Sequence, residues 1–95
     1  MRIKYETLGR QKPILFCENC GEIRFAVLGN QDIDACIEYS FDPARVKGER
    51  RCWDKFEGGL GGGFLEPPTA IRLNIKRASE PVFLWVDLIK GDKNG

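Results

Sequence analysis

The four cysteines are the residues of this chain with the clearest potential for chemistry. Cys17 and Cys20 are separated by two residues in the stretch ILFCENCGEIRF, and Gly21 follows the second of them. Two thiolates on either side of a short turn can bind one Zn²⁺ ion from the same side, and a glycine there lets the chain turn back without a Cβ clash. This spacing predicts a zinc knuckle within a hairpin over residues 14–25.

Cys36 and Cys52 are the candidates to complete the zinc site. Fifteen residues lie between Cys20 and Cys36, and fifteen more lie between Cys36 and Cys52. The knuckle resembles one half of a zinc ribbon or rubredoxin-type site, although the chain lacks a second C-x-x-C pair. We expect the four thiolates to bind one structural zinc ion. The alternative is that the cysteines are reduced and partly buried as small hydrophobic side chains.

Catalysis has little support in the sequence. A redox role for the CENC pair is disfavoured, because catalytic pairs lie at a helix N-terminus and a strand-like pattern follows this one. The chain has no histidine, the commonest general base. Asp34 and Glu38 share a strand face with Cys36, but we expect them to be solvated surface charges. The glycine-rich residues 58–64 lack the spacing of a phosphate-binding loop and predict a flexible connection, so we expect no enzymatic activity.

A basic segment interleaved with aromatic residues offers a possible nucleic-acid surface. Phosphate contacts from cations and base stacking on an exposed ring are the interactions that such a surface requires. The aromatic residues Trp53 and Phe56 can instead belong to the hydrophobic core, with the cations facing solvent. The candidate nucleic-acid-binding residues are Arg45, Lys47, Arg50, Arg51, Trp53 and Lys55.

Length and composition indicate one small soluble domain. The chain has 95 residues, of which 42% are hydrophobic and 31% charged, and its formal net charge is +1. This charge gives no argument for nucleic acid, whose binding proteins are usually strongly basic. No run of about 18 apolar residues predicts a membrane span, and the N-terminus is too polar for a secretory signal. We expect a cytoplasmic protein, whose reduced thiols are available to bind metal.

Alternation of apolar and polar residues predicts that most of the chain is β-strand. Residues 32–41 follow the pattern most closely, with the apolar side chains on one face and Cys36 on the other. Residues 71–76 predict a strand with one buried and one wet face, whereas residues 82–89 are apolar on both faces and predict a central or doubly covered strand. Further strands are expected at 2–8, 14–16 and 22–28.

One helix is expected, over residues 43–57. Asp42 and Pro43 form a helix-start signal, an N-cap acceptor followed by proline at the first helical position. The spacing of Trp53 and Phe56 fits the apolar stripe of such a helix. The predicted fold is therefore α+β and strand-rich: an antiparallel sheet of five or six strands, one helix packed on it, and the zinc-knuckle hairpin.

The functional expectation follows from these elements. We expect a non-catalytic domain, stabilised by cysteine-bound zinc, that binds a partner protein through an exposed strand edge or helix face. The alternative is a zinc-containing nucleic-acid-binding protein that uses residues 45–56. Salt dependence separates the two, because release of counterions from nucleic acid makes its binding fall steeply with added salt.

Overall fold

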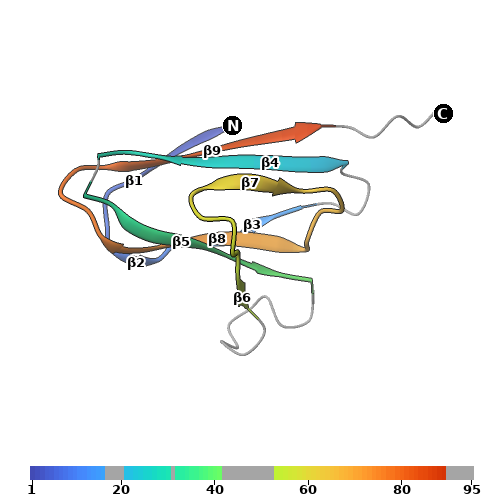
Figure 1. Ribbon diagram of the computed structural model, residues 1–95, viewed down its shortest axis with the longest axis horizontal. Helices are drawn as coiled ribbons and strands as arrows, with labels where there is room; N and C mark the ends of the chain where they lie inside the picture. The colour runs from blue at the N-terminus through green and yellow to red at the C-terminus, as the bar shows by residue number, and fades with distance from the viewer. Residues whose placement is uncertain (17–20, 31, 42–52, 90–95) are drawn as a thin grey trace.

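The computed structural model describes residues 1–16, 21–30, 32–41 and 53–89. These residues form nine β-strands and no helix. All strand pairs are antiparallel, and they build two sheets that stack as the upper and lower layers of Figure 1. The described part of the chain is therefore a β-sandwich, and none of its segments is a helix that would span a membrane.

Each layer has its own set of strands. Sheet A has the order β1-β9-β4-β7, and sheet B has the order β2-β8-β5-β6 with β3 also paired to β8. The strands of sheet A are β1 (Arg2–Tyr5), β9 (Val82–Ile89), β4 (Glu22–Leu28) and β7 (Gly61–Phe64). Those of sheet B are β2 (Gly9–Arg10), β8 (Ala70–Arg77), β5 (Asp34–Ser40), β6 (Asp54–Lys55) and β3 (Ile14–Leu15).

The hydrophobic core lies between the two sheets. Every second residue of the long strands points inward, as the period of two requires. Each fully buried aliphatic side chain stabilises the fold by about 2 kcal/mol relative to an exposed one. At one end, the rings of Phe25, Phe56 and Phe64 contact one another, with centroids 4.9 to 5.9 Å apart. The buried core residues are Ile23, Phe25, Val27, Ile37, Ile71, Leu73, Ile75, Val82, Leu84 and Val86.

The strand predictions for the four longest strands are confirmed. β4, β5 and β8 lie within a residue or two of the ranges expected from alternation, and β9 matches the range expected from an apolar run. β9 is also a central strand, because it pairs with β1 on one side and β4 on the other. Alternation was sufficient for β4, β5 and β8 because each of these strands packs one face against the core.

The predicted α+β fold with a helix over residues 43–57 is wrong. In the described part of that range, Asp54 and Lys55 form β6 and pair with β5; residues 42–52 lie outside the described part. The backbone N–H of Phe56 donates a hydrogen bond to the carbonyl of Ile37 at 2.8 Å. Trp53 and Phe56 contact opposite sides of sheet B, so their spacing of three does not mark one helical stripe.

The single sheet and the hairpin over residues 14–25 are also wrong. β3 pairs with β8 in sheet B, whereas β4 pairs with β7 and β9 in sheet A. The two strands that flank the cysteine pair therefore belong to different layers. The physical reason is burial: one sheet of this composition would leave its apolar face in water, and stacking two sheets covers both apolar faces.

Candidate functional site

The outer face of sheet A exposes large apolar side chains near its centre. Phe83 and Trp85 point outward from β9, and their partners across the ladder in β4 are Leu28 and Ala26. Trp85 is 39% exposed and Leu28 is 47% exposed. We call these four residues the aromatic face. Exposed tryptophan beside aliphatic residues is typical of protein contact surfaces.

Cations border the aromatic face. The Arg2 guanidinium lies 4.5 Å from the centre of the Phe83 ring, a cation–π contact. At the other end, Arg24 donates a hydrogen bond to Glu22 at 2.8 Å. That bond, the charge of Glu22 and a smaller effect of Asp87 raise the pKa of Arg24 above its ordinary value. The charge of Arg24 is therefore compensated locally, whereas Arg2 lies on the ring of Phe83.

The free edge of sheet A at β7 has backbone but almost no side chains. Residues 58–64 were expected to form a flexible loop, but Gly61–Phe64 pair with β4 as a strand. The N–H of Val27 donates to the carbonyl of Leu60 at 2.7 Å. Because N–H and C=O directions alternate along an antiparallel strand, Gly61 and Gly63 point theirs away from β4, toward the free edge.

Two glycines of β7 are needed for packing. A Cβ on Gly62 would lie 2.6 Å from the Phe56 ring, which covers the inner side of the strand. A Cβ on Gly63 would collide with the carbonyl oxygen of Ile23. Gly61 is different, because its nearest neighbour would be the Phe25 carbonyl at 3.8 Å. Position 61 therefore tolerates a side chain, and its glycine leaves the edge unshielded.

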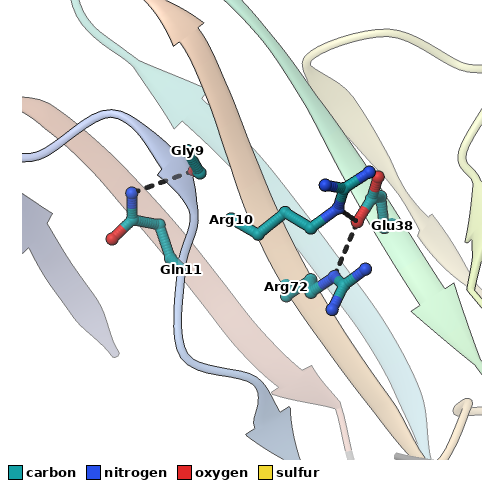
Figure 2. Close-up of polar contacts among 5 residues, drawn as sticks. All are labelled: Gly9, Arg10, Gln11, Glu38 and Arg72. Carbon is teal, nitrogen blue, oxygen red and sulfur yellow. Dashed lines mark hydrogen bonds and ion pairs between the residues drawn. The ribbon is translucent and has the colours of Figure 1, made fainter. Parts of the chain in front are cut away.

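The outer face of sheet B carries a buried ion cluster that Figure 2 shows. Glu38 on β5 and Arg72 on β8 are ladder partners, and Arg72 Nε donates to Glu38 Oε1 at 2.6 Å. Arg10 Nε donates to the same oxygen at 3.3 Å. Gln11 holds the β2 turn through bonds from Nε2 to the carbonyls of Thr7 and Gly9. The expectation of a solvated Glu38 and a wet outer face on β8 is wrong here.

Trp53 covers the ion cluster. The Arg72 guanidinium carbon lies 4.1 Å from the centre of the Trp53 ring, and the two residues are 8% and 9% exposed. Burial of this kind desolvates the guanidinium and strengthens its interaction with the ring. Trp53 Nε1 and Arg72 Nη2 are both buried, and neither has a hydrogen-bond partner within the described part of the chain. We call Arg10, Glu38, Arg72 and Trp53 the arginine–tryptophan cluster.

Of the four predicted zinc ligands, one falls in the described part of the chain. Cys36 is buried on β5, on the outer face of sheet B, opposite Asn74. Its orientation away from the core agrees with the alternation pattern. Cys17, Cys20 and Cys52 lie outside the described residues. Among the described residues, no group of three or more acidic or cysteine side chains is arranged to hold a metal ion.

Of the predicted nucleic-acid-binding residues, two fall in the described part of the chain. Lys55 is exposed on β6, and Trp53 is buried in the arginine–tryptophan cluster. A buried indole offers no face for base stacking. Arg45, Lys47, Arg50 and Arg51 lie outside the described residues. The structure therefore does not bring the described members of this set together as an aromatic and basic surface.

Sequence reasoning missed the aromatic face, the β7 edge and the pairing of Arg72 with Glu38. The outward positions of Arg72 and Glu38 follow from alternation, but only the ladder register shows that they are opposite each other. Their opposite charges on two strong strands were the available signal. The exposure of Trp85 had no signal, because an apolar outward residue is usual in a covered strand.

Comparison with known proteins adds no assignment. No protein family, curated protein or solved structure matches this chain.

Proposed function

We propose that this chain is a non-catalytic protein-interaction domain that adds an extended segment of its partner to the free edge of β7. The observation that carries the proposal is the unshielded edge at Gly61 and Gly63. Edge strands are usually protected by charged side chains, proline or bulges, because an open edge pairs with other chains. The opposite edge of sheet A, β1, carries Arg2 and Lys4, whereas β7 has no such protection.

Strand addition uses the backbone groups of β7. Gly61 and Gly63 each offer one N–H donor and one C=O acceptor at the edge, in the spacing of an antiparallel or parallel ladder. Within the described part of the chain, no hydrogen bond from another segment occupies these groups. Backbone pairing of this kind supplies affinity, and pockets or surfaces beside the edge supply specificity.

The side-chain preference follows from what lies beside the edge. On the outer side of sheet A, one row of ladder partners runs from Gly61 through Ala26 to Trp85. A large side chain on an added strand would meet bare backbone and a methyl group before it reached the indole. Aromatic side chains commonly cover glycine on a neighbouring strand. The partner segment is therefore expected to carry aromatic or large aliphatic residues at alternate positions.

The test compares two substitutions at Gly61, with peptides selected on the wild-type domain from a random display library. Gly61→Pro removes the outward N–H without breaking a bond to β4, and Gly61→Ala keeps it. We expect Gly61→Ala to bind the selected peptides like the wild type. Gly61→Pro should bind them about tenfold more weakly, because it removes one main-chain hydrogen bond and hinders close approach of the peptide backbone. Circular dichroism and melting temperature verify that both variants fold.

Two results would count against strand addition. One is equal peptide affinity for Gly61→Pro and Gly61→Ala. The other is unchanged binding of a selected peptide whose alternate amides are N-methylated, since methylation removes the donors that the ladder needs. A loss of binding in Trp85→Ala alone would locate the contact on the aromatic face instead.

We further propose that zinc bound by Cys17 and Cys20, with Cys52 as the favoured further cysteine ligand, stabilises the domain. Phe16 donates from N–H to the Thr69 carbonyl at 2.9 Å, and Thr69 donates to the Ser40 carbonyl at 2.8 Å. Phe16, which precedes Cys17, is therefore aligned with the end of β5. Cys36 lies four residues earlier on β5, about 13 Å away along an extended strand. This distance favours Cys52 over Cys36 as a further ligand.

Metal content of protein purified without added zinc tests this proposal. We expect about one zinc ion per chain and a large fall in melting temperature on chelation, because the free energy of zinc binding adds to that of folding. Cys17→Ser should abolish both effects. Cys36→Ser is the matched control and should retain zinc. A metal-free protein whose melting temperature is insensitive to chelator would contradict a zinc site.

Nucleic-acid binding through residues 45–56 is the second candidate. Its support is the basic composition of that segment, and the burial of Trp53 removes one of the two aromatic side chains it relied on. The double variant Arg50→Ala/Arg51→Ala distinguishes the candidates, since oligonucleotide binding would weaken in it and peptide binding would not. Loss of oligonucleotide affinity that also depends steeply on salt would favour the second candidate.

A further inference from the structure

The arginine–tryptophan cluster contains more positive charge than its carboxylate neutralises. Arg10 and Arg72 both bond to one oxygen of Glu38. Lys55 is the ladder partner of Glu38 on β6, so a third cation lies on the next strand. Among the described residues, Glu38 is the only carboxylate that the two guanidinium groups contact. Arg10 and Lys55 are exposed, so the excess positive charge lies beside the buried Arg72–Glu38 pair, where it attracts an anion.

Two donors in this cluster lack an acceptor. Among the described residues, the printed bond of Arg72 is from Nε to Glu38, and its terminal Nη2 is completely buried without a partner. The indole Nε1 of Trp53 is the second buried donor without an acceptor. The stacking distance of 4.1 Å places both residues in contact. Buried donors in native proteins almost always have an acceptor, and leaving one unpaired is costly.

We infer that the arginine–tryptophan cluster is a binding site for a carboxylate anion, held by the terminal nitrogens of Arg72 with the Trp53 indole as an additional donor. The planar fork of a guanidinium group matches the two oxygens of a carboxylate. Arg10, whose side chain is 47% exposed, lies beside Arg72, and both guanidinium groups reach the same Glu38 oxygen, as Figure 2 shows. This site is on sheet B, so it is independent of strand addition at β7.

The experiment uses acetate as the probe, in the full chain with Trp85→Phe so that Trp53 is the only tryptophan. Acetate replaces chloride at constant ionic strength, and Trp53 fluorescence and melting temperature are recorded. We expect a saturable fluorescence change and a rise in melting temperature, because a ligand that binds only the folded state stabilises it. In Arg72→Lys, which keeps the charge but loses the fork, the acetate dissociation constant should rise at least about tenfold.

Trp53→Phe provides a second measurement if Arg72→Lys fails to fold. This variant keeps an aromatic ring over Arg72 but removes the indole N–H donor together with part of the ring area, so the melting temperature should respond less to acetate than in the wild type. Lys76→Ala, on the exposed end of β8, is the control and should respond like the wild type. No acetate response beyond that of chloride, or an equal response in Arg72→Lys and the control, would overturn the inference.

The source of the carboxylate can be distinguished with peptides. A tripeptide with a free C-terminal carboxylate and the same tripeptide as an amide are compared with acetate. Tighter binding of the free acid than of acetate, with no binding of the amide, would identify a polypeptide end as the ligand. Equal binding of acetate and the free acid would identify a small carboxylic acid. Binding of the amide as tight as that of the acid would contradict a carboxylate site.

Discussion

The outer faces of the two sheets differ in what they leave in water. On sheet A, apolar side chains are exposed: Trp85 is 39% accessible beside Leu28. On sheet B, charged side chains are buried: Arg72 and Glu38 have side chains 10% and 13% exposed. The same kind of strand therefore presents an apolar surface to solvent in one layer and a covered ion pair in the other.

This difference indicates two kinds of specificity. An exposed apolar surface lowers the free energy of binding when a partner covers it, because apolar area is then removed from water. A buried ion pair contributes little net stability, because desolvation offsets the attraction, but it strongly penalises loss of one partner. The face of sheet A is thus suited to contact with another molecule, and that of sheet B to holding fixed charges in place.

Replacing each tryptophan by alanine gives the largest expected contrast. Trp53→Ala should lower the free energy of unfolding by about 3 kcal/mol, because a buried ring and its cation–π contact are lost. Trp85→Ala should cost about 1 kcal/mol or less, since much of the indole is already in water. Urea denaturation of both variants measures the difference. Similar losses at the two positions would remove the distinction between the faces.

Neutralising one carboxylate on each face gives a similar contrast for charge. Glu38→Gln should cost about 3 kcal/mol, because it leaves a buried guanidinium without its counter-charge. Glu22→Gln should cost about 1 kcal/mol or less, and added salt should remove most of that effect. The double variant Glu38→Leu/Arg72→Met should recover part of the loss. If Glu22→Gln proved the more damaging, the Glu38 pair would not be the buried one.

Tyr5, which lies between the sheets on β1, gives the smallest expected effect. Burial raises the pKa of its phenol above 10.0, because the phenolate is disfavoured in apolar surroundings. The unfolded chain therefore releases this proton first, and the free energy of unfolding falls as pH rises from 10 through the folded pKa. Subtracting the profile of Tyr5→Phe isolates this contribution. A difference that stays flat above pH 10 would mean that Tyr5 is solvated.

How much of the fold was predictable depended on local pattern. β4, β5 and β8 were predicted from alternation and β9 from its apolar run, because these patterns lie within the sequence of each strand. The number of sheets could not be predicted in this way. Pairing of β1 with β9, and placement of β3 and β4 in different sheets, depend on contacts between residues far apart in the sequence. The helix was mispredicted because Asp42-Pro43 and aromatic spacing are local signals that tertiary packing can override.

The candidate sites were less predictable than the fold. The charged residues of the ion cluster could be identified in the sequence. Their solvent exposure could not, because it depends on Trp53, which comes from another segment of the chain. The polarity of a residue predicted its exposure poorly on both outer faces: Arg72 is buried and Trp85 is not. Zinc binding is predicted from the spacing of four cysteines, of which Cys36 lies in the described part of the chain and the other three do not.

The position of β9 between β1 and β4 has a consequence for the order of folding. β1 is synthesised before the other strands of sheet A and has no partner in that sheet until β9, about 80 residues later, has emerged from the ribosome. Closing such a long loop is entropically costly and places β-sandwiches among the slower folders, in milliseconds to seconds. Nascent chains that end before residue 89 are then expected to expose β1 and β4 to chaperones, and emergence of β9 from the ribosome becomes the event that permits sheet A to form.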